Sequence, residues 1–178
     1  MNHNLTLIPA ALLLAAFASH PAFAQVPGPS LPIIGSPTAI AIGGYLPSGD
    51  ASRRGGSVQI TGEFRYTLFV PNPLNAPART VAALGVEYGS KSGNHSLVVP
   101  LTVGEIVGFN GSPTAGGVGF GGGGVGAFYE SQSGVSSQIR LGGYVELGYN
   151  VTSMVFVDAK YQMASHANGA TVMAGLRF

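Results

Sequence analysis

The chain has 178 residues, of which 46% are hydrophobic and only 8% are charged, and its formal net charge is +1. Such a balanced, charge-poor chain excludes a nucleic-acid-binding protein and an acidic disordered tail. Because it contains no cysteine, disulfides, thiolate metal sites and thiol nucleophiles are excluded as well.

Residues 1–24 have the pattern of a secretory signal peptide. Residues 5–18 are apolar, Pro21 interrupts them, and the Ala-Phe-Ala motif of residues 22–24 suits signal peptidase. We therefore expect cleavage before Gln25. The alternative is an uncleaved membrane anchor, which is disfavoured because the apolar run is shorter than the roughly 20 residues that span a bilayer.

Residues 25–37 contain four prolines and are predicted to be an extended lead-in to a single domain over residues 38–178. Glycine and proline interrupt the domain so often that we expect no transmembrane helix in it. The mean hydropathy of the chain is nevertheless positive, at +0.33. Strands are therefore the expected elements.

Segments of about ten residues alternate apolar with polar or small side chains, as membrane-spanning strands do. In residues 57–69 the even positions, such as Ile60 and Phe64, suit lipid, whereas Glu63 and Arg65 suit a polar interior. The predicted strands are Thr38–Leu46, Ser57–Phe69, Arg79–Tyr88, Leu97–Gly108, Ala115–Glu130, Ile139–Tyr149, Val155–Met163 and Ala170–Phe178.

These eight strands predict an all-β fold, a closed antiparallel transmembrane barrel with both ends on the periplasmic side. The connections expected outside are residues 47–56, 89–95, 131–137 and 165–169, and those expected inside are 70–78, 109–114 and 150–153. The two sets are similar in length. The alternative at the level of fold is a soluble, glycine-rich exported sandwich.

Three features of the predicted strands resist the pattern. Pro100 forfeits a ladder hydrogen bond, so a bulge or a late strand start is expected there. Glu105 shares the parity of lipid-facing residues, and we expect the strand to end or bulge by Gly104. The run Gly121–Gly124 is interpreted as a close-packed barrel wall, with a flexible loop as the alternative.

The chain ends in Phe178, preceded by apolar residues at alternate positions: Val172, Ala174 and Leu176. This ending resembles the C-terminal assembly signal that the barrel assembly machinery recognises. Together with the export signal and Gly-aromatic segments such as Gly142-Gly143-Tyr144, it resembles the small outer-membrane β-barrel families related to OmpA and OmpX. The resemblance covers residues 38–178 and implies the cell outer membrane, with outer-membrane lipids and lipopolysaccharide as surroundings.

Aromatic residues are expected to form two girdles at the membrane interfaces. The outer girdle is predicted to contain Tyr45, Tyr88, Tyr129 and Tyr161, and the inner girdle Tyr66, Tyr149 and Phe178.

The charges predicted to face the lumen are balanced in sign: Glu63, Glu87, Glu146 and Asp158 against Arg65, Arg140, Lys160 and Arg177. An eight-stranded barrel is only wide enough for side chains to fill. We therefore predict an ionic core that plugs the lumen, with a selective solute path as the alternative.

The sequence contains few side chains that could catalyse a reaction, and no catalytic, cofactor-binding or metal-binding residue is predicted. Removal of the signal peptide would leave His95 and His166, and no metalloprotease or serine-hydrolase motif occurs. A histidine paired with Ser96 or Ser165 is the remote enzymatic alternative. Arg53 and Arg54 could meet lipopolysaccharide phosphates, although a solvated loop is the favoured interpretation.

The sequence therefore predicts a non-catalytic outer-membrane barrel with a structural or surface-interaction role, no cofactor and no nucleic-acid partner. A minor channel for small or apolar solutes and a loop-mediated adhesin are the competing functions. The sequence specifies neither a ligand nor an oligomeric state.

Overall fold

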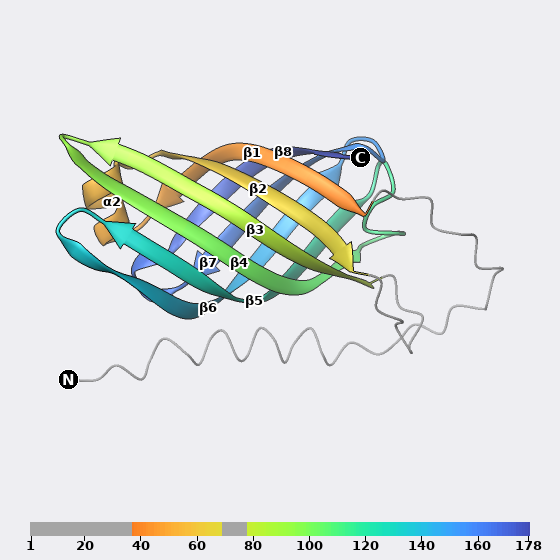
Figure 1. Cartoon of the computed structure of the whole chain (residues 1–178). Helices are drawn as coiled ribbons and strands as arrows, with labels where there is room; N and C mark the ends of the chain where they lie inside the picture. The colour runs from red at the N-terminus through yellow and green to blue at the C-terminus, as the bar shows by residue number, and fades with distance from the viewer. Residues whose placement is uncertain (1–36, 69–77) are drawn as a thin grey trace. The chain divides into compact units, whose positions relative to one another are not determined.

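The computed structural model describes residues 37–68 and 78–178, and within them the chain forms a closed barrel of eight antiparallel strands in sequence order (Figure 1). This confirms the predicted fold class. The strands are β1 (Thr38–Pro47), β2 (Gln59–Leu68), β3 (Ala78–Lys91), β4 (Asn94–Gly108), β5 (Gly119–Gln132), β6 (Val135–Asn150), β7 (Val155–Met163) and β8 (Gly169–Arg177).

Three sequence-based predictions lie outside the described residues: the signal peptide, the lead-in up to residue 36, and the inner connection over residues 70–77. Among the described residues, no helix has the length and hydropathy needed to cross a membrane.

The barrel closes where the last strand meets the first. β8 pairs with β1 from Ala39↔Arg177 to Pro47↔Gly169. Next to the Ala39↔Arg177 pair, the hydroxyl of Thr38 donates to the Phe178 carbonyl at 2.5 Å, and the Phe178 N–H donates to the Thr38 carbonyl at 3.0 Å. The first and last strands therefore bond to each other, and neither is a free edge strand.

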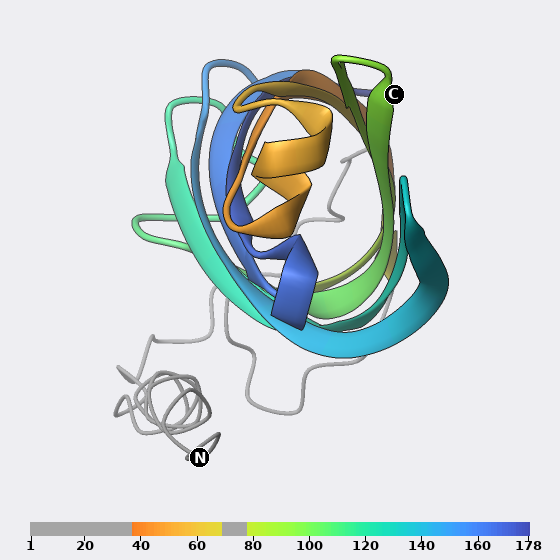
Figure 2. The same cartoon turned by 90° about the vertical axis from the view of Figure 1, so that its left-hand side faces the viewer.

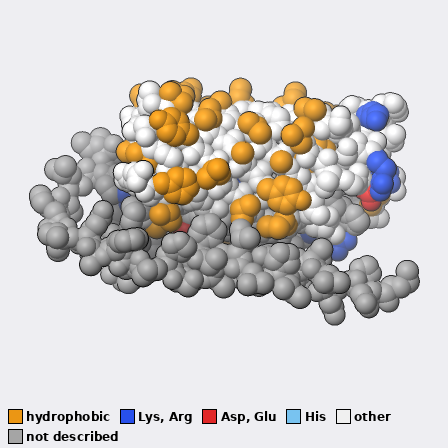
Figure 3. Space-filling view, turned by 180° about the vertical axis from the view of Figure 1, so that it is seen from behind, with side chains coloured by type: hydrophobic (Ala, Val, Ile, Leu, Met, Phe, Trp, Pro, Cys, Tyr) orange, Lys and Arg blue, Asp and Glu red, His pale blue; other side chains and the backbone are white. Residues whose placement is uncertain are grey.

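The side chains alternate between the two faces as predicted. On β2, Ile60 is 76% exposed on the outer face, whereas Glu63 and Arg65 are 8% and 7% exposed and point into the lumen. Hydrophobic side chains cover the visible outer wall, and Lys and Arg side chains gather at one end (Figure 3). An apolar outside with charges enclosed is the reverse of a soluble sandwich, and it suits a barrel surrounded by lipid.

Pro100 and Glu105 do not interrupt β4, so both exceptions predicted for this strand are wrong. The register of β4 against β5 is continuous from Ser96↔Gln132 to Gly108↔Phe120. Against β3, the pairing is interrupted at Pro100 and Val99 but resumes in the same register, without a bulge. Pro100 points inward opposite Gly85, where a Cβ would lie 2.8 Å from the proline ring. Glycine at that position therefore makes room for the ring. Glu105 is exposed on the outer face three residues before the strand ends, near the interface, where a carboxylate costs less than at the midplane.

The glycine run of residues 121–124 lies inside β5 and pairs with both neighbouring strands. It is therefore part of the barrel wall, as interpreted from the sequence, and not a loop.

Two of the predicted outer connections are present but shorter than predicted, because their strands continue. β3 and β4 run on to a two-residue turn at Ser92 and Gly93, which both have positive φ, the geometry of a type I′ hairpin. β5 and β6 run on to a second two-residue turn, at Ser133 and Gly134, where only Gly134 has a positive φ and the register shifts between Glu130 and Gln132. These polar strand ends lack the apolar alternation that signals a lipid-facing strand, and so they read as loops in the sequence.

The other two connections at this end contain short helices that sequence reasoning missed. α2 (Asp50–Gly55) has an acidic residue in its first turn and Arg53 and Arg54 in its last, which complements the helix dipole. A 3-10 helix, η1 (Ser165–Ala167), follows β7. Viewed end on, both lie across the mouth of the barrel (Figure 2).

Glycines in the wall create the space that aromatic side chains occupy in the lumen. A Cβ on Gly148 would lie 2.3 Å from Cζ of Phe120, and a Cβ on Gly175 would lie 2.2 Å from Cζ of Phe156. Both rings are fully buried. The paired glycines and aromatics therefore set how tightly the lumen is filled.

We expect Gly148→Ala to lower the free energy of unfolding by about 1–3 kcal/mol, because the new methyl group overpacks the Phe120 ring. The matched control is Gly44→Ala, whose Cβ would meet only Val58, at 3.9 Å, and should be near neutral. Urea unfolding in lipid vesicles measures both. Equal losses in the two variants would contradict the close packing of Gly148 against Phe120.

Candidate functional site

The lumen is the candidate functional site, and its centre is the guanidinium of Arg65. Its Nε lies 2.5 Å from Oε1 of Glu63, its Nη1 lies 3.2 Å from Oε2 of Glu146, and its Nη2 pairs with Asp158. Lys160 Nζ adds a second cation 2.5 Å from Oε2 of Glu63. All five side chains are buried.

Three of these ion pairs cross the barrel, whereas Arg65 and Glu63 both stand on β2. Arg65 stands on β2 and Glu146 on β6, four strands apart in a closed ring of eight, so the two residues belong to opposite walls. A second contact of this kind joins β7 to β3, since the Gln162 amide donates to Glu87 at 2.7 Å. Polar side chains therefore brace the lumen at two levels.

An apolar layer lies on the side of the ionic cluster nearer the chain ends. The rings of Phe120 and Phe156 meet edge to face with centroids 6.4 Å apart. The guanidinium carbons of Arg65 and Arg177 lie 5.2 Å and 4.4 Å from the centroid of Phe156. Phe156 thus packs against two cations, a favourable arrangement for an aromatic ring.

Towards α2 the lumen is filled by Tyr45 and by a second apolar cluster. The Tyr45 hydroxyl donates to the Ala167 carbonyl at 3.0 Å, which ties β1 to η1. The second cluster consists of Val98, Phe128, Ala164 and Ala167. Tyr45 is fully buried, so its prediction as a girdle residue is wrong. Counting the alternation along β1 from Ile40 and Ile42 would have placed it inward.

The eight residues predicted for the ionic core separate into four groups. Arg65, Glu63, Glu146, Asp158 and Lys160 meet directly, Glu87 meets Gln162, and Arg177 packs on Phe156. Arg140 lies apart, near the mouth, where its Nη2 donates to Gln138 at 2.6 Å. Gln162 was missed as a bridging residue, although its parity on β7 matches that of Asp158 and Lys160.

The remaining aromatic residues of the predicted girdles face outward. Tyr88, Tyr129 and Tyr161 are exposed towards the α2 end, and Tyr66, Tyr149 and Phe178 towards the other. The residues of the predicted assembly signal also point outward: Val172, Ala174, Leu176 and Phe178.

Of the histidine and serine pairs suggested by the sequence, only the one between His95 and Ser96 has both side chains described, and these two side chains do not meet. His95 Nδ1 lies 2.9 Å from the hydroxyl of Ser133, across two hairpin turns, whereas Ser96 is fully buried. The side chain of His166 lies outside the description. Within the described part of the chain, no three His, Asp or Glu side chains are grouped to hold a metal ion.

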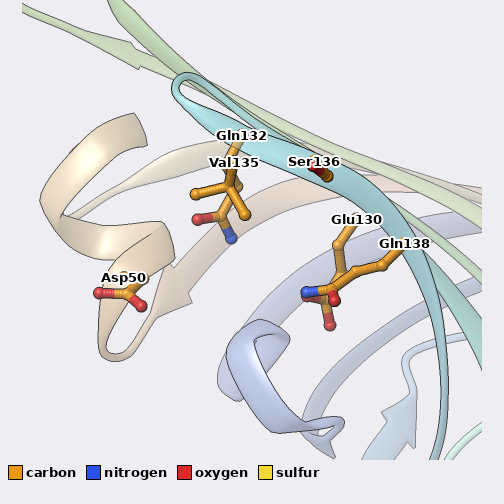
Figure 4. Close-up of a pocket in the computed structure, with 6 residues that line it drawn as sticks. All are labelled: Asp50, Glu130, Gln132, Val135, Ser136 and Gln138. Atoms are coloured by element: carbon orange, nitrogen blue, oxygen red, sulfur yellow. The ribbon is translucent and has the colours of Figure 1, made fainter.

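A small pocket lies at the mouth, between α2 and the β5–β6 hairpin (Figure 4). It has a volume of ≈ 30 Å³, room for about one or two water molecules, so it is too small for a metabolite. Its lining residues are Asp50, Glu130, Gln132, Val135, Ser136 and Gln138.

The fold is that of known outer-membrane barrels. The chain is similar to the outer membrane protein Ail of Yersinia pestis, determined in a phospholipid bilayer nanodisc, with 16% identity and a TM-score of 0.52 over 80% of this chain and 99% of that one. It is also similar to Neisserial surface protein A, with 15% identity and a TM-score of 0.52 over 79% and 95%. At such identities the likeness concerns the fold, a small eight-stranded outer-membrane β-barrel.

Comparison with models of protein families finds no match, and comparison with curated protein sequences finds none either.

Removing the central cation should destabilise the barrel strongly. We expect Arg65→Leu to cost about 3–5 kcal/mol, because the carboxylates of Glu146 and Asp158 stay buried without their cation. The control is Arg53→Leu. Arg53 pairs with Asp50, but its side chain is 75% exposed, and such a pair is worth at most about 1 kcal/mol.

The double variant Arg65→Leu, Glu146→Leu should recover part of the loss, since it removes both charges of one pair. Unfolding by urea in vesicles, monitored by gel mobility, gives all three values. If Arg65→Leu costs no more than Arg53→Leu, Arg65 is not the centre of a compensated cluster.

Proposed function

We propose that this protein is a non-catalytic outer-membrane barrel with a structural and surface-interaction role, and that it does not conduct solutes. The observation that carries the proposal is the set of ion pairs by which Arg65 joins opposite walls. Fully buried side chains above and below that level, Phe128 and Phe156 among them, support the same conclusion. A water-filled path would leave such side chains partly exposed.

The orientation belongs to the same proposal. With eight strands both ends of the barrel lie on one side, which is the periplasmic side in outer-membrane barrels. The end that carries α2 and the two long hairpins then faces the outside, among lipopolysaccharide. Recognition of the C-terminal strand by the barrel assembly machinery stays a prediction. The residues expected to be recognised point outward: Val172, Ala174, Leu176 and Phe178.

The competing function is a minor channel, and conductance separates the two. We expect the refolded protein to give no resolved single-channel openings in planar bilayers, because the ionic cluster and the two apolar layers fill the lumen. Phe120→Ala combined with Phe156→Ala should permit leak currents by emptying one layer. Its control, Phe64→Ala, removes an outward ring of the same size and should show no leak current. Discrete openings of the unaltered protein would contradict the proposal and favour the channel.

A further inference from the structure

One carboxylate lies on the lipid-facing wall of the barrel. Glu105 of β4 is exposed on the outer face, and its neighbours along the strand on that face, Val103 and Val107, are exposed as well. The other acidic side chains of the described strands are buried: Glu63, Glu87, Glu130, Glu146 and Asp158. Among these strands, only Glu105 therefore directs a carboxylate towards lipid.

The chain provides no Lys or Arg partner for Glu105. None of the ion pairs in the described part of the chain involves it. All 8 Lys and Arg residues lie within the described ranges, because residues 1–36 and 69–77 contain neither type. Three of them lie at the α2 end: Arg53, Arg54 and Lys91. The others occupy inward positions on the strands: Arg65, Arg79, Arg140, Lys160 and Arg177. A counter-charge for Glu105 therefore has to come from outside the chain.

Glu105 lies at the level of the inner aromatic girdle. Followed along paired residues, Tyr66 of β2 is level with Val103 of β4. Followed in the same way from the other side, Tyr149 of β6 is level with Phe109, just after β4. A line drawn on the wall between the two tyrosines therefore crosses β4 midway between Val103 and Phe109, next to Glu105. This is the level at which interfacial aromatic rings meet lipid headgroups.

The residues beside Glu105 leave its carboxylate accessible from the membrane. Glu105 pairs with Thr80 of β3 and with Gly123 of β5, and paired residues on one face have Cβ atoms about 5 Å apart. Gly123 has no side chain, and Thr80 adds a hydroxyl. Towards the midplane, the outward side chains on these strands are apolar and exposed: Leu101, Val103 and Val125. Polar groups at headgroup level above an apolar wall match the shape of one phospholipid.

The chemistry of these groups favours one kind of headgroup. An ionised carboxylate only accepts hydrogen bonds, and a primary ammonium offers three donors. Phosphatidylethanolamine carries such an ammonium, whereas the trimethylammonium of phosphatidylcholine has the charge without a donor. Phosphatidylglycerol has a net negative charge, which Glu105 repels. Charge-assisted hydrogen bonds are roughly twice as strong as neutral ones, so the ethanolamine headgroup gains most from Glu105.

We propose that Glu105 and Thr80 form a binding site for phosphatidylethanolamine in the inner leaflet, with the headgroup ammonium on the Glu105 carboxylate and the phosphate accepting from the Thr80 hydroxyl. The inference goes beyond the proposed function and shares with it only the orientation of the barrel. A second copy of the chain fits this wall poorly. Because no Lys or Arg points outward from the described strands here, a copy would offer Glu105 only apolar side chains or another carboxylate.

Fluorescence quenching by brominated lipids measures lipid selectivity at this point of the wall. The chain has no tryptophan, so Val103→Trp creates a single fluorophore two residues from Glu105 on the same face. The full barrel is refolded into phosphatidylcholine vesicles that contain increasing fractions of one lipid with brominated acyl chains, with EDTA present to remove divalent cations. We expect phosphatidylethanolamine to bind about threefold more tightly than phosphatidylcholine, as suits one ion pair at an interface. Phosphatidylglycerol should bind no better than phosphatidylcholine.

Variants of the protein assign the preference to Glu105. In the Val103→Trp background, Glu105→Gln keeps the shape of the side chain but removes its charge, and it should abolish the preference. Thr80→Val should reduce the preference in part. The matched control is Asp50→Asn, which removes a carboxylate at the α2 end and should leave the preference unchanged. Heat-dependent gel mobility verifies that each variant is folded.

A second fluorophore shows that the preference is local. Val172→Trp lies on β8, four strands from β4 in the closed ring, at an outward and exposed apolar position. There, brominated phosphatidylethanolamine and phosphatidylcholine should bind equally.

Four results would overturn the proposal: equal binding of the two lipids at Val103→Trp, a preference that survives Glu105→Gln, the same preference at Val172→Trp, or tighter binding of phosphatidylglycerol. Each leaves the conductance result untouched. Channel openings would refute the proposed function and leave the lipid preference measurable.

Discussion

The guanidinium of Arg65 meets carboxylates that come from three strands, and the interior of the barrel is arranged around that contact. A buried charge is tolerable only when its partners compensate it. The strands must therefore keep the register that brings Glu146 and Asp158 to the same point in the lumen. The apolar layers on either side exclude water from the cluster, which strengthens each ion pair and raises the cost of losing one.

The requirement for a filled lumen also makes the two ends of the barrel different. Under the proposed function the filled lumen conducts no solute, and the protein meets its surroundings through its outer wall and its rims. At the α2 end, the β3–β4 and β5–β6 hairpins project beyond the tyrosine girdle, while β7 bends into the mouth to supply Ala164 and η1. Filling the mouth with this segment is what leaves β6 without a neighbour above Gly143. Filling of the mouth and the unpaired edge of β6 thus have one structural cause.

Sequence reasoning predicted the strands and their faces because lipid and lumen impose opposite polarity on successive residues. β7 was predicted with its observed bounds, Val155–Met163. The predictions failed where that contrast vanishes. The polar ends of β3 to β6 leave the lipid, and α2 lies over the mouth, so neither shows a two-residue period. Pro100 was misjudged because its tolerance depends on Gly85, a neighbour that only the strand register reveals.

Within the candidate site, the parity of each strand identified the charged residues that face inward, but not which of them meet. The contact of Arg65 with Glu146 depends on the diameter and the stagger of the barrel, which no local pattern encodes. Arg140 has the same parity as Glu146 on β6 and yet lies near the mouth with Gln138. Tyr45 was misplaced for a different reason. The alternation along β1 indicated an inward side chain, but Tyr45 was assigned to the aromatic girdle instead.

The most direct test of the account is the position of the two faces relative to lipid. The chain has no tryptophan, so Phe64→Trp and Phe128→Trp each create a single fluorophore, the first on the outer wall and the second in the lumen. In vesicles with brominated acyl chains, we expect strong quenching of Phe64→Trp and little of Phe128→Trp. Quenching of the second but not the first would mean that the apolar wall faces inward, and it would contradict the account at its foundation.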